Sequence, residues 1–170
     1  MKNRIGERVC DWIITDYRGA KDVDIEHIST GERRTSIRYE HIKRHKSAFE
    51  PTTYGVGYLG EGDHKASENG KLTRLYQLWK GMFYRCYSGN EPSYSGCTVG
   101  ERWHNFQHFA EDVKTLPNYA QWLANPGQWQ IDKDLLATGQ PIYSPETCQF
   151  ITQSDNIREA MRRRWASLDD

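Results

Sequence analysis

The sequence predicts an α+β fold in which a small antiparallel β module precedes a helical segment and a β-hairpin that runs into a helix. Three observations predict this class. Strand-like runs separated by turn residues fill the start of the chain, apolar residues at helical spacing begin near Lys71, and two strand-like runs after Trp129 precede an amphipathic stretch. The chain also contains six tryptophans, and such aromatics usually fill a core. We therefore expect a folded protein.

Charge and hydropathy narrow the function classes. The 170 residues carry 23 Lys and Arg against 23 Asp and Glu, so any basic face must be local. No stretch is long and apolar enough to span a bilayer, and the first residues lead into no signal-peptide run. We therefore expect a cytoplasmic protein with no membrane partner, whose four cysteines are free thiols.

Residues 1–46 form the predicted β module. Strands are expected at Val9–Thr15, Val23–Ile28 and Thr35–Ile42, with Gly31 in the turn before the third. The most basic local cluster of the chain lies here, and it comprises Arg33, Arg34, Arg38, Lys43, Arg44, His45 and Lys46. Such a cluster is able to follow a phosphate backbone, and Arg34, Arg38, Lys43 and Arg44 are its candidate nucleic-acid contacts. The open alternative is a solvated sheet face, much of whose charge pairs with Asp22, Asp24 and Glu26.

Residues 47–70 break the pattern, because they are rich in glycine and have few periodic apolar positions. We interpret them as a linker or an ordered loop that crosses close to another backbone or to DNA. The segment lacks the Lys-Ser/Thr ending of a phosphate-binding loop, which argues against a nucleotide site.

Two helices are predicted next. Apolar residues at helical spacing give the first helix its buried face, which comprises Leu72, Leu75, Tyr76, Trp79, Met82, Phe83 and Cys86. Residues 87–100 contain turn formers and are expected to be a loop. A second helix is predicted over Glu101–Lys114, with Trp103, Phe106, Phe109, Ala110 and Val113 inward. Residues 115–128 then return the chain to the hairpin.

Two cysteines and two histidines in this region form a candidate zinc set. Cys86 and Cys97 supply thiols, and His104 and His108 share one face of the predicted helix. The cysteines lack the close spacing of a zinc knuckle, and Cys86 also fits the apolar face. The sequence therefore argues against structural zinc.

The hairpin and the helix after it carry the chemistry. Strand-like runs at Gln130–Leu135 and Cys148–Ile151 flank a turn at Thr138–Pro141, and Thr152 or Ser154 is expected to cap the helix. The apolar face of that helix would be Ile157, Ala160, Met161 and Trp165. A carboxylate at the end of one strand and an amide in the first helical turn are able to converge on one metal ion.

Several blocks of this region, in order and spacing, carry a family resemblance. The blocks are Leu75–Tyr87, Pro92–Tyr94, Cys97–Val99 with Glu101–Trp103 and Phe106, Ile131–Asp134 and Tyr143–Cys148. Over residues 54–156 the chain resembles the phage-encoded HNH homing-endonuclease-like proteins of the ββα-metal nuclease family. The resemblance implies an HNH-like domain over residues 71–170, with a ββα core at about residues 129–166.

The resemblance also assigns roles. Asp132 matches the strand-end metal ligand, and Asn156 matches the metal ligand on the helix; both oxygens suit Mg²⁺, with Mn²⁺ as the alternative. Lys133 stands where the family has its general-base histidine, and Thr147 stands where the middle asparagine is usual. A protonated lysine cannot accept a proton but is able to clamp a phosphate. The base is then Asp134, a histidine among His64, His104 and His108, or a metal-bound hydroxide.

The arginines of the last helix complete the expected site. Arg158 and Arg162 share one helical face, and together with Arg163 they are candidate phosphate contacts; a solvated helix explains them equally. The resemblance implies a metal-dependent endonuclease that nicks or cleaves duplex DNA in the cytoplasm of a bacterial host. The alternative is an inactive HNH-fold phage protein that binds DNA or a host protein.

Overall fold

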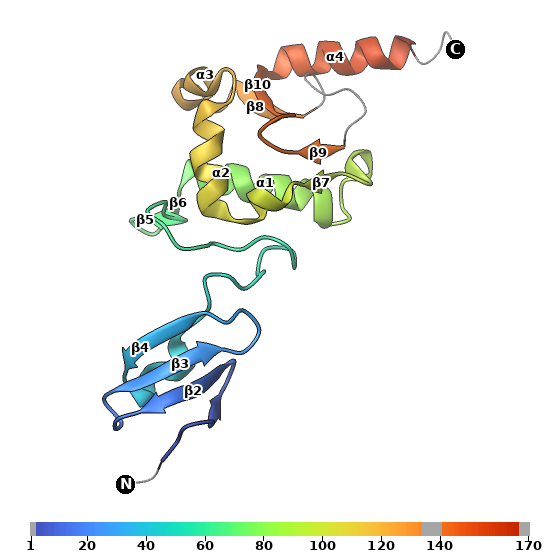
Figure 1. Ribbon diagram of the computed structural model, residues 1–170. Helices are drawn as coiled ribbons and strands as arrows, with labels where there is room; N and C mark the ends of the chain where they lie inside the picture. Colours follow the sequence, from blue (N-terminus) through green and yellow to red (C-terminus); the bar gives the residue numbers. More distant parts are fainter. Residues whose placement is uncertain (1–2, 134–140, 167–170) are drawn as a thin grey trace.

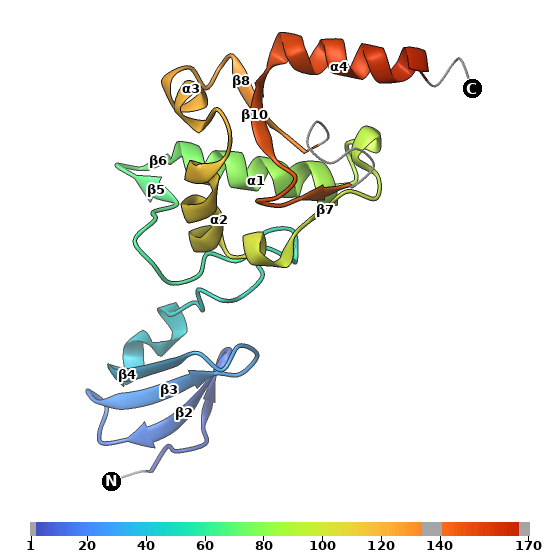
Figure 2. The ribbon, with the colours of Figure 1, turned by 45° about the horizontal axis from the view of Figure 1, so that its top comes forward.

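The computed structural model describes residues 3–133 and 141–166, and within the helix that ends the described chain it describes side chains only as far as Arg162. The protein is α+β, with an N-terminal antiparallel sheet, as predicted. Figures 1 and 2 show this sheet at one end of the molecule and the helices at the other. Each end has its own buried apolar cluster.

The N-terminal sheet has the strand order β1–β2–β3–β4. Its strands are β1 (Arg8–Val9), β2 (Trp12–Tyr17), β3 (Val23–His27) and β4 (Arg33–Ile37). Alternate residues of β3 are buried, as expected where one face of a sheet covers a core. That core comprises Val9, Trp12, Ile14, Val23, Ile25 and Ile42.

Two predicted strands of this module have wrong bounds. Val9–Thr15 is not one strand, because Cys10 takes a φ of 55° and the chain reverses so that Val9 pairs with Trp12. The third strand ends at Ile37 rather than Ile42, and a 3₁₀ helix follows at Tyr39–Arg44. This helix lets Ile42 enter the core, where the side chain is fully buried.

The glycine-rich segment 47–70 is an ordered loop rather than a free linker. Tyr58 forms a parallel bridge with Asn105, in which its N–H donates to the His104 carbonyl at 2.8 Å and its carbonyl accepts from the Phe106 N–H at 3.0 Å. The segment ends in the β5 (Ser67–Glu68) and β6 (Lys71–Leu72) hairpin. A Cβ on Gly57 would lie 2.8 Å from the Trp79 ring. A glycine is therefore needed where the loop crosses α1.

The helix α1 (Arg74–Tyr87) confirms the prediction from helical spacing. Thr73 caps it by accepting a hydrogen bond from the Tyr76 N–H at 3.3 Å. Trp79, Met82 and Phe83 are fully buried. Leu72 is not part of the buried face, because it lies in β6 and is 47% exposed.

The predicted second helix is interrupted. Glu101–His104 is a 3₁₀ helix, and α2 (Phe106–Asp112) begins only after Asn105, whose side chain accepts a hydrogen bond from the Gln107 N–H at 2.9 Å. Asn105 is also the residue that pairs with Tyr58, so the extended backbone there serves both contacts. A second 3₁₀ turn, Val113–Thr115, ends the helical run.

A third helix, α3 (Tyr119–Ala124), was not predicted. It packs Trp122 on Phe150 with ring centroids 5.0 Å apart. Asn118, at a φ of 63°, begins it and donates a hydrogen bond to the Phe150 carbonyl at 2.9 Å. The helix therefore depends on a strand 30 residues away, which local sequence does not reveal.

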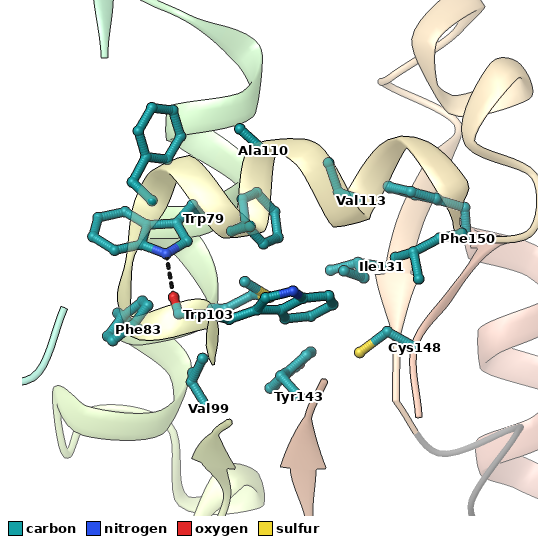
Figure 3. Packing of buried hydrophobic residues seen from close by; sticks show 14 of the residues in the cluster. Trp79, Phe83, Val99, Trp103, Ala110, Val113, Ile131, Tyr143, Cys148 and Phe150 are labelled. Carbon is teal, nitrogen blue, oxygen red and sulfur yellow. Dashed lines mark hydrogen bonds between the residues drawn. The ribbon is translucent and has the colours of Figure 1, made fainter. Parts of the chain in front are cut away.

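Figure 3 shows how α1 and α2 enclose the larger core. The Trp79 indole N–H donates to the Trp103 carbonyl at 2.7 Å, inside a cluster that also contains Phe83 and Phe150. Satisfying this buried indole avoids the cost of an unpaired donor. The cluster therefore joins the helices to the final strands.

Two antiparallel strands and a helix end the described chain. The strands are β8 (Trp129–Asp132) and β10 (Gln149–Thr152), in a register that sets Gln149 opposite Asp132. Between them, β9 (Ile142–Tyr143) leaves the pair and joins β7 (Thr98–Val99) in parallel, inside the region predicted to be a loop. The predicted turn at Thr138–Pro141 lies outside the described residues except for Pro141.

The helix α4 (Gln153–Ala166) follows β10 directly. Thr152 caps it as predicted, because its hydroxyl oxygen accepts a hydrogen bond from the Asp155 N–H at 3.1 Å. The predicted apolar face is wrong for the residues whose side chains are described. Ile157 and Met161 are 56% and 57% exposed, and Ala160 is also exposed. The side chain of Trp165 lies outside the described part.

The reason is that α4 lies against the strands by its first turns alone. Asn156 and Glu159, one turn apart, are the half-buried positions of the described side chains. Figures 1 and 2 show the helix extending away from β8 and β10 beyond them.

Candidate active site

A cleft of about 210 Å³ lies where α1, β8, β9 and the first turn of α4 meet. Its walls include the aromatic rings of Tyr94, Trp122, Trp129 and Tyr143. The polar groups that line it, apart from the tyrosine hydroxyls, are Arg85, Gln130, Asp132, Lys133 and Asn156. Three residues of the predicted site, Asp132, Lys133 and Asn156, therefore line one cleft.

The strand register explains why Asp132 and Asn156 share this cleft. Asp132 ends β8 opposite Gln149, and β10 then runs back to Thr152, where α4 begins. Asn156 lies in the first turn of α4. Asp132 is only 8% exposed. A carboxylate and an amide therefore contribute oxygen atoms to the same enclosed space.

Lys133 is buried, with 7% exposure, beside two tyrosine rings. Its Nζ lies 5.7 Å from the centroid of Tyr94 and 5.8 Å from that of Tyr143. The negative faces of aromatic rings attract cations at such distances. Asp134, the other predicted catalytic residue, lies outside the described residues.

Arg85 is a site residue that the sequence analysis missed. Its guanidinium carbon lies 5.6 Å from the Tyr94 centroid and 5.4 Å from the Tyr143 centroid, and its Nε donates to the Tyr143 hydroxyl at 3.1 Å. The signal in the sequence was an arginine directly before Cys86 at the edge of the apolar face of α1. Long side chains at such edges often place their charge in a cleft.

The buried Thr147 fixes the loop between β9 and β10. The Thr147 hydroxyl donates to the Ile142 carbonyl at 2.7 Å and accepts from the Ser144 N–H at 3.0 Å. Burial raises the pKa of the Cys148 thiol to about 12, and burial also raises the pKa of Tyr143 above its ordinary value. Both groups therefore stay neutral near pH 7.

The candidate histidine bases do not line the cleft. His104 and His108 line a separate depression with Tyr58, Glu101 and Arg102. The His64 Nε2 lies 3.5 Å from Lys114 Nζ. The histidine candidates for the base are therefore not among the described residues that line the cleft.

The candidate zinc set also has other contacts. The His104 Nε2 lies 2.9 Å from the Val99 carbonyl, and burial raises the pKa of Cys86 to about 11. Cys97 is buried, with 6% exposure. Within residues 3–133 and 141–166, no three histidine, cysteine or acidic residues are grouped as metal ligands.

Two arginines of α4, Arg158 and Arg162, are exposed and paired along the helix. Arg158 lies 3.2 Å from Asp155, and Arg162 lies 2.6 Å from Glu159; both arginine side chains are 76% exposed. They line one shallow depression beside Ile151. Arg163 lies in α4, but its side chain is outside the described part.

The basic residues of the N-terminal module fall into two groups. Arg34 lies over the Trp12 ring at 5.6 Å, and its Nε donates to Glu32 at 2.6 Å, so its charge is held against the module. Arg38, Lys43 and Arg44 are exposed around the 3₁₀ helix.

The acidic residues in β3 and directly before it have separate partners. Glu26 pairs with Arg33 at 2.7 Å. Asp22 and Asp24 pair instead with Arg18, at 2.8 and 2.6 Å. The charge of the basic cluster is therefore only partly compensated by these acids.

No protein-family profile, curated protein sequence or solved structure matches this chain. Among the helices that the structure describes, none has the length and apolar character to cross a membrane.

Proposed function

We propose that the protein is a metal-dependent DNA endonuclease of HNH type, and that the cleft at Asp132 is its active site. The observation that carries this proposal is the convergence of Asp132, Asn156 and Lys133 on one enclosed space. Two residues with oxygen donors and a buried cation in the same cleft are groups that metal-dependent phosphodiester hydrolysis is able to use. The order of β8, β10 and α4 agrees with a ββα arrangement.

The donor set fits a hard divalent cation. Asp132 would supply a carboxylate oxygen and Asn156 an amide oxygen, and Mg²⁺ is commonly held by one or two such groups with water in the remaining positions. A bound ion of this kind polarises a phosphate and makes an attacking water more acidic. The low exposure of Asp132 keeps its charge poorly screened by solvent.

Lys133 has an electrostatic role in this proposal. An ammonium group at ordinary pKa is protonated near pH 7 and cannot take a proton from water. Inside the cleft, beside two aromatic rings, it is placed to stabilise negative charge that grows on a phosphate oxygen. Loss of Lys133 should therefore slow the reaction without changing the metal preference.

DNA outside the cleft would be held by exposed basic residues. Arg158 and Arg162 lie on the helix that carries Asn156, and Arg38, Lys43 and Arg44 offer further contacts on the N-terminal module. The ion pair between Arg158 and Asp155 is exposed on both sides and therefore weak, so a phosphate is able to compete for Arg158.

Nicking of a supercoiled plasmid tests the proposal. We expect cleavage by the wild type in Mg²⁺ or Mn²⁺, none in EDTA, and a loss of about 100-fold or more in Asp132→Asn, because a neutral amide replaces the charged metal ligand. Glu146→Gln removes an exposed carboxylate outside the cleft and should keep wild-type activity. Equal cleavage by both variants, or no cleavage in any divalent metal, would contradict the proposal.

Lys133 favours a second function, in which the protein binds DNA or another protein and does not cleave. No histidine lines the cleft among the described residues, and a buried lysine stands beside the carboxylate. A binding protein that kept the fold and lost the reaction would have these features. It predicts salt-dependent retention of duplex DNA, or a stable protein complex, with no nicking in any metal.

A further inference from the structure

Two cations enter the cleft from different elements and pack against the same pair of rings. Arg85 comes from α1 and Lys133 follows β8, and each lies 5.4–5.8 Å from the centroids of Tyr94 and Tyr143. Aromatic faces attract both charges, but they do not neutralise them. Two cationic side chains therefore pack against the same two rings in this cleft.

The charged side chains of the cleft also bear on the ligand it attracts. Its described lining carries two cations, Arg85 and Lys133, and one carboxylate, Asp132. A divalent ion at Asp132 would add positive charge to this lining. An enclosed positive site of this kind attracts an anionic ligand.

Arg85 also has a hydrogen-bond donor that is not used within the described residues. Its Nε donates to Tyr143, whereas its buried Nη2 has no hydrogen-bond partner among the described residues. A buried unsatisfied donor costs stability unless a ligand or water meets it. The planar guanidinium is suited to phosphate oxygens, and a phosphate group fits a space of about 210 Å³.

We propose that Arg85, together with Lys133, forms a phosphate-binding subsite that holds a DNA phosphate inside the cleft next to Asp132. The inference rests on the proposed function, because it takes the phosphate to be that of the bound DNA strand. Arg85 would contribute a hydrogen bond through Nη2, and the Tyr143 hydroxyl would keep the guanidinium in place.

Binding of a short duplex in EDTA, followed by fluorescence anisotropy over a range of salt concentrations, tests this. We expect Arg85→Met to weaken binding about ten-fold or more and to lower the slope of log affinity against log salt by about 0.9, the value for one phosphate contact. Lys80→Met removes an exposed charge from α1 outside the cleft and should leave that slope unchanged. An Arg85→Met variant with the wild-type affinity and slope would overturn the proposal.

A second arm separates this inference from the proposed function. Inorganic phosphate at 50 mM, compared with chloride at equal ionic strength, should raise the melting temperature of the wild type and not that of Arg85→Met, since a ligand of the folded state stabilises it. If the wild type neither binds nor cuts DNA, the proposed function fails. The effect of phosphate on the melting temperature then decides by itself whether the phosphate subsite exists. A response lost in Arg85→Met supports a subsite for phosphate from another source, and no response in the wild type overturns the subsite.

Discussion

Asp112 shows how one carboxylate orders the entry to the second helix. It accepts hydrogen bonds from Arg102 at 2.7 and 2.9 Å and from the Trp103 indole at 3.0 Å. The hydrogen bonds from Arg102 hold the pKa of Asp112 below its usual value of 3.8. Because Trp103 is fully buried, this carboxylate links the surface to the core.

The lowered pKa predicts an acid-dependent loss of stability. A carboxylate with a lowered folded-state pKa contributes stability that is present above its unfolded-state pKa and is lost as pH falls through the folded-state value. Asp112→Asn should therefore lower the unfolding free energy by about 1–3 kcal/mol at pH 7 and by less near pH 3. Urea denaturation at several pH values measures this, and a deficit that stays constant with pH would contradict it.

At the candidate site, the sequence predicted Asp132, Lys133 and Asn156, and the structure places all three on one cleft. Arg85 was not predicted as a site residue, because the helical pattern of α1 shows only that it neighbours the buried face. Its position against Tyr94 and Tyr143 depends on residues 9 and 58 positions away, whose packing no local pattern reveals.

At the scale of the element, the start of α4 places Asn156 in the cleft. The Thr152 hydroxyl accepts from the Asp155 N–H at 3.1 Å and lies 2.6 Å from the Asp155 carboxylate. Such a cap fixes where the first turn begins. The direction of the Asn156 side chain therefore depends on Thr152.

Removing this cap should loosen α4. Thr152→Ala is expected to cost about 0.5–2 kcal/mol and to lower the helical signal in circular dichroism, since a backbone N–H loses its partner. Ser154→Ala is the matched control, because the Ser154 hydroxyl contacts only the Thr152 hydroxyl among the hydrogen bonds that the structure describes. Equal losses in the two variants would show that Thr152 is not the cap.

The elements differ in how far local sequence could predict them. Helical spacing alone was enough to predict α1, whereas the second helix was predicted too long because Asn105 was not recognised as a cap. The pair β7 and β9 joins residues more than 40 positions apart in two short strands, which periodicity cannot detect. On α4 the apolar pattern predicted burial, but the helix projects beyond the strands that would cover it.

At the scale of the whole molecule, two separate cores have one chain connection. Figures 1 and 2 show the N-terminal sheet apart from the helices, with the glycine-rich segment between them. The division into a β module and a helical part followed from a change of hydrophobic period. The hydrophobic pattern did not predict that the segment packs on α1 and α2, because its glycines fit against side chains that are distant in the sequence.

Two cores predict two unfolding steps. Ile25→Ala removes a fully buried side chain from the core of the N-terminal sheet and should lower the stability of that core by about 2–5 kcal/mol. The unfolding transition of the helical part should stay in place. Phe109→Ala should lower the stability of the helical part and leave the transition of the N-terminal sheet in place. Calorimetry of both variants and the wild type measures this, and a single transition that shifts equally in both would indicate one cooperative unit.

The central claim is that Asp132 and Asn156 hold a divalent ion in the cleft. Loss of the electron paramagnetic resonance signal of free Mn²⁺ measures binding directly and does not depend on turnover. We predict one bound Mn²⁺ in the wild type and in Glu146→Gln, and binding weakened by about ten-fold or more in Asp132→Asn, where a charged oxygen ligand is lost. Equal Mn²⁺ binding by the wild type and Asp132→Asn would contradict the account.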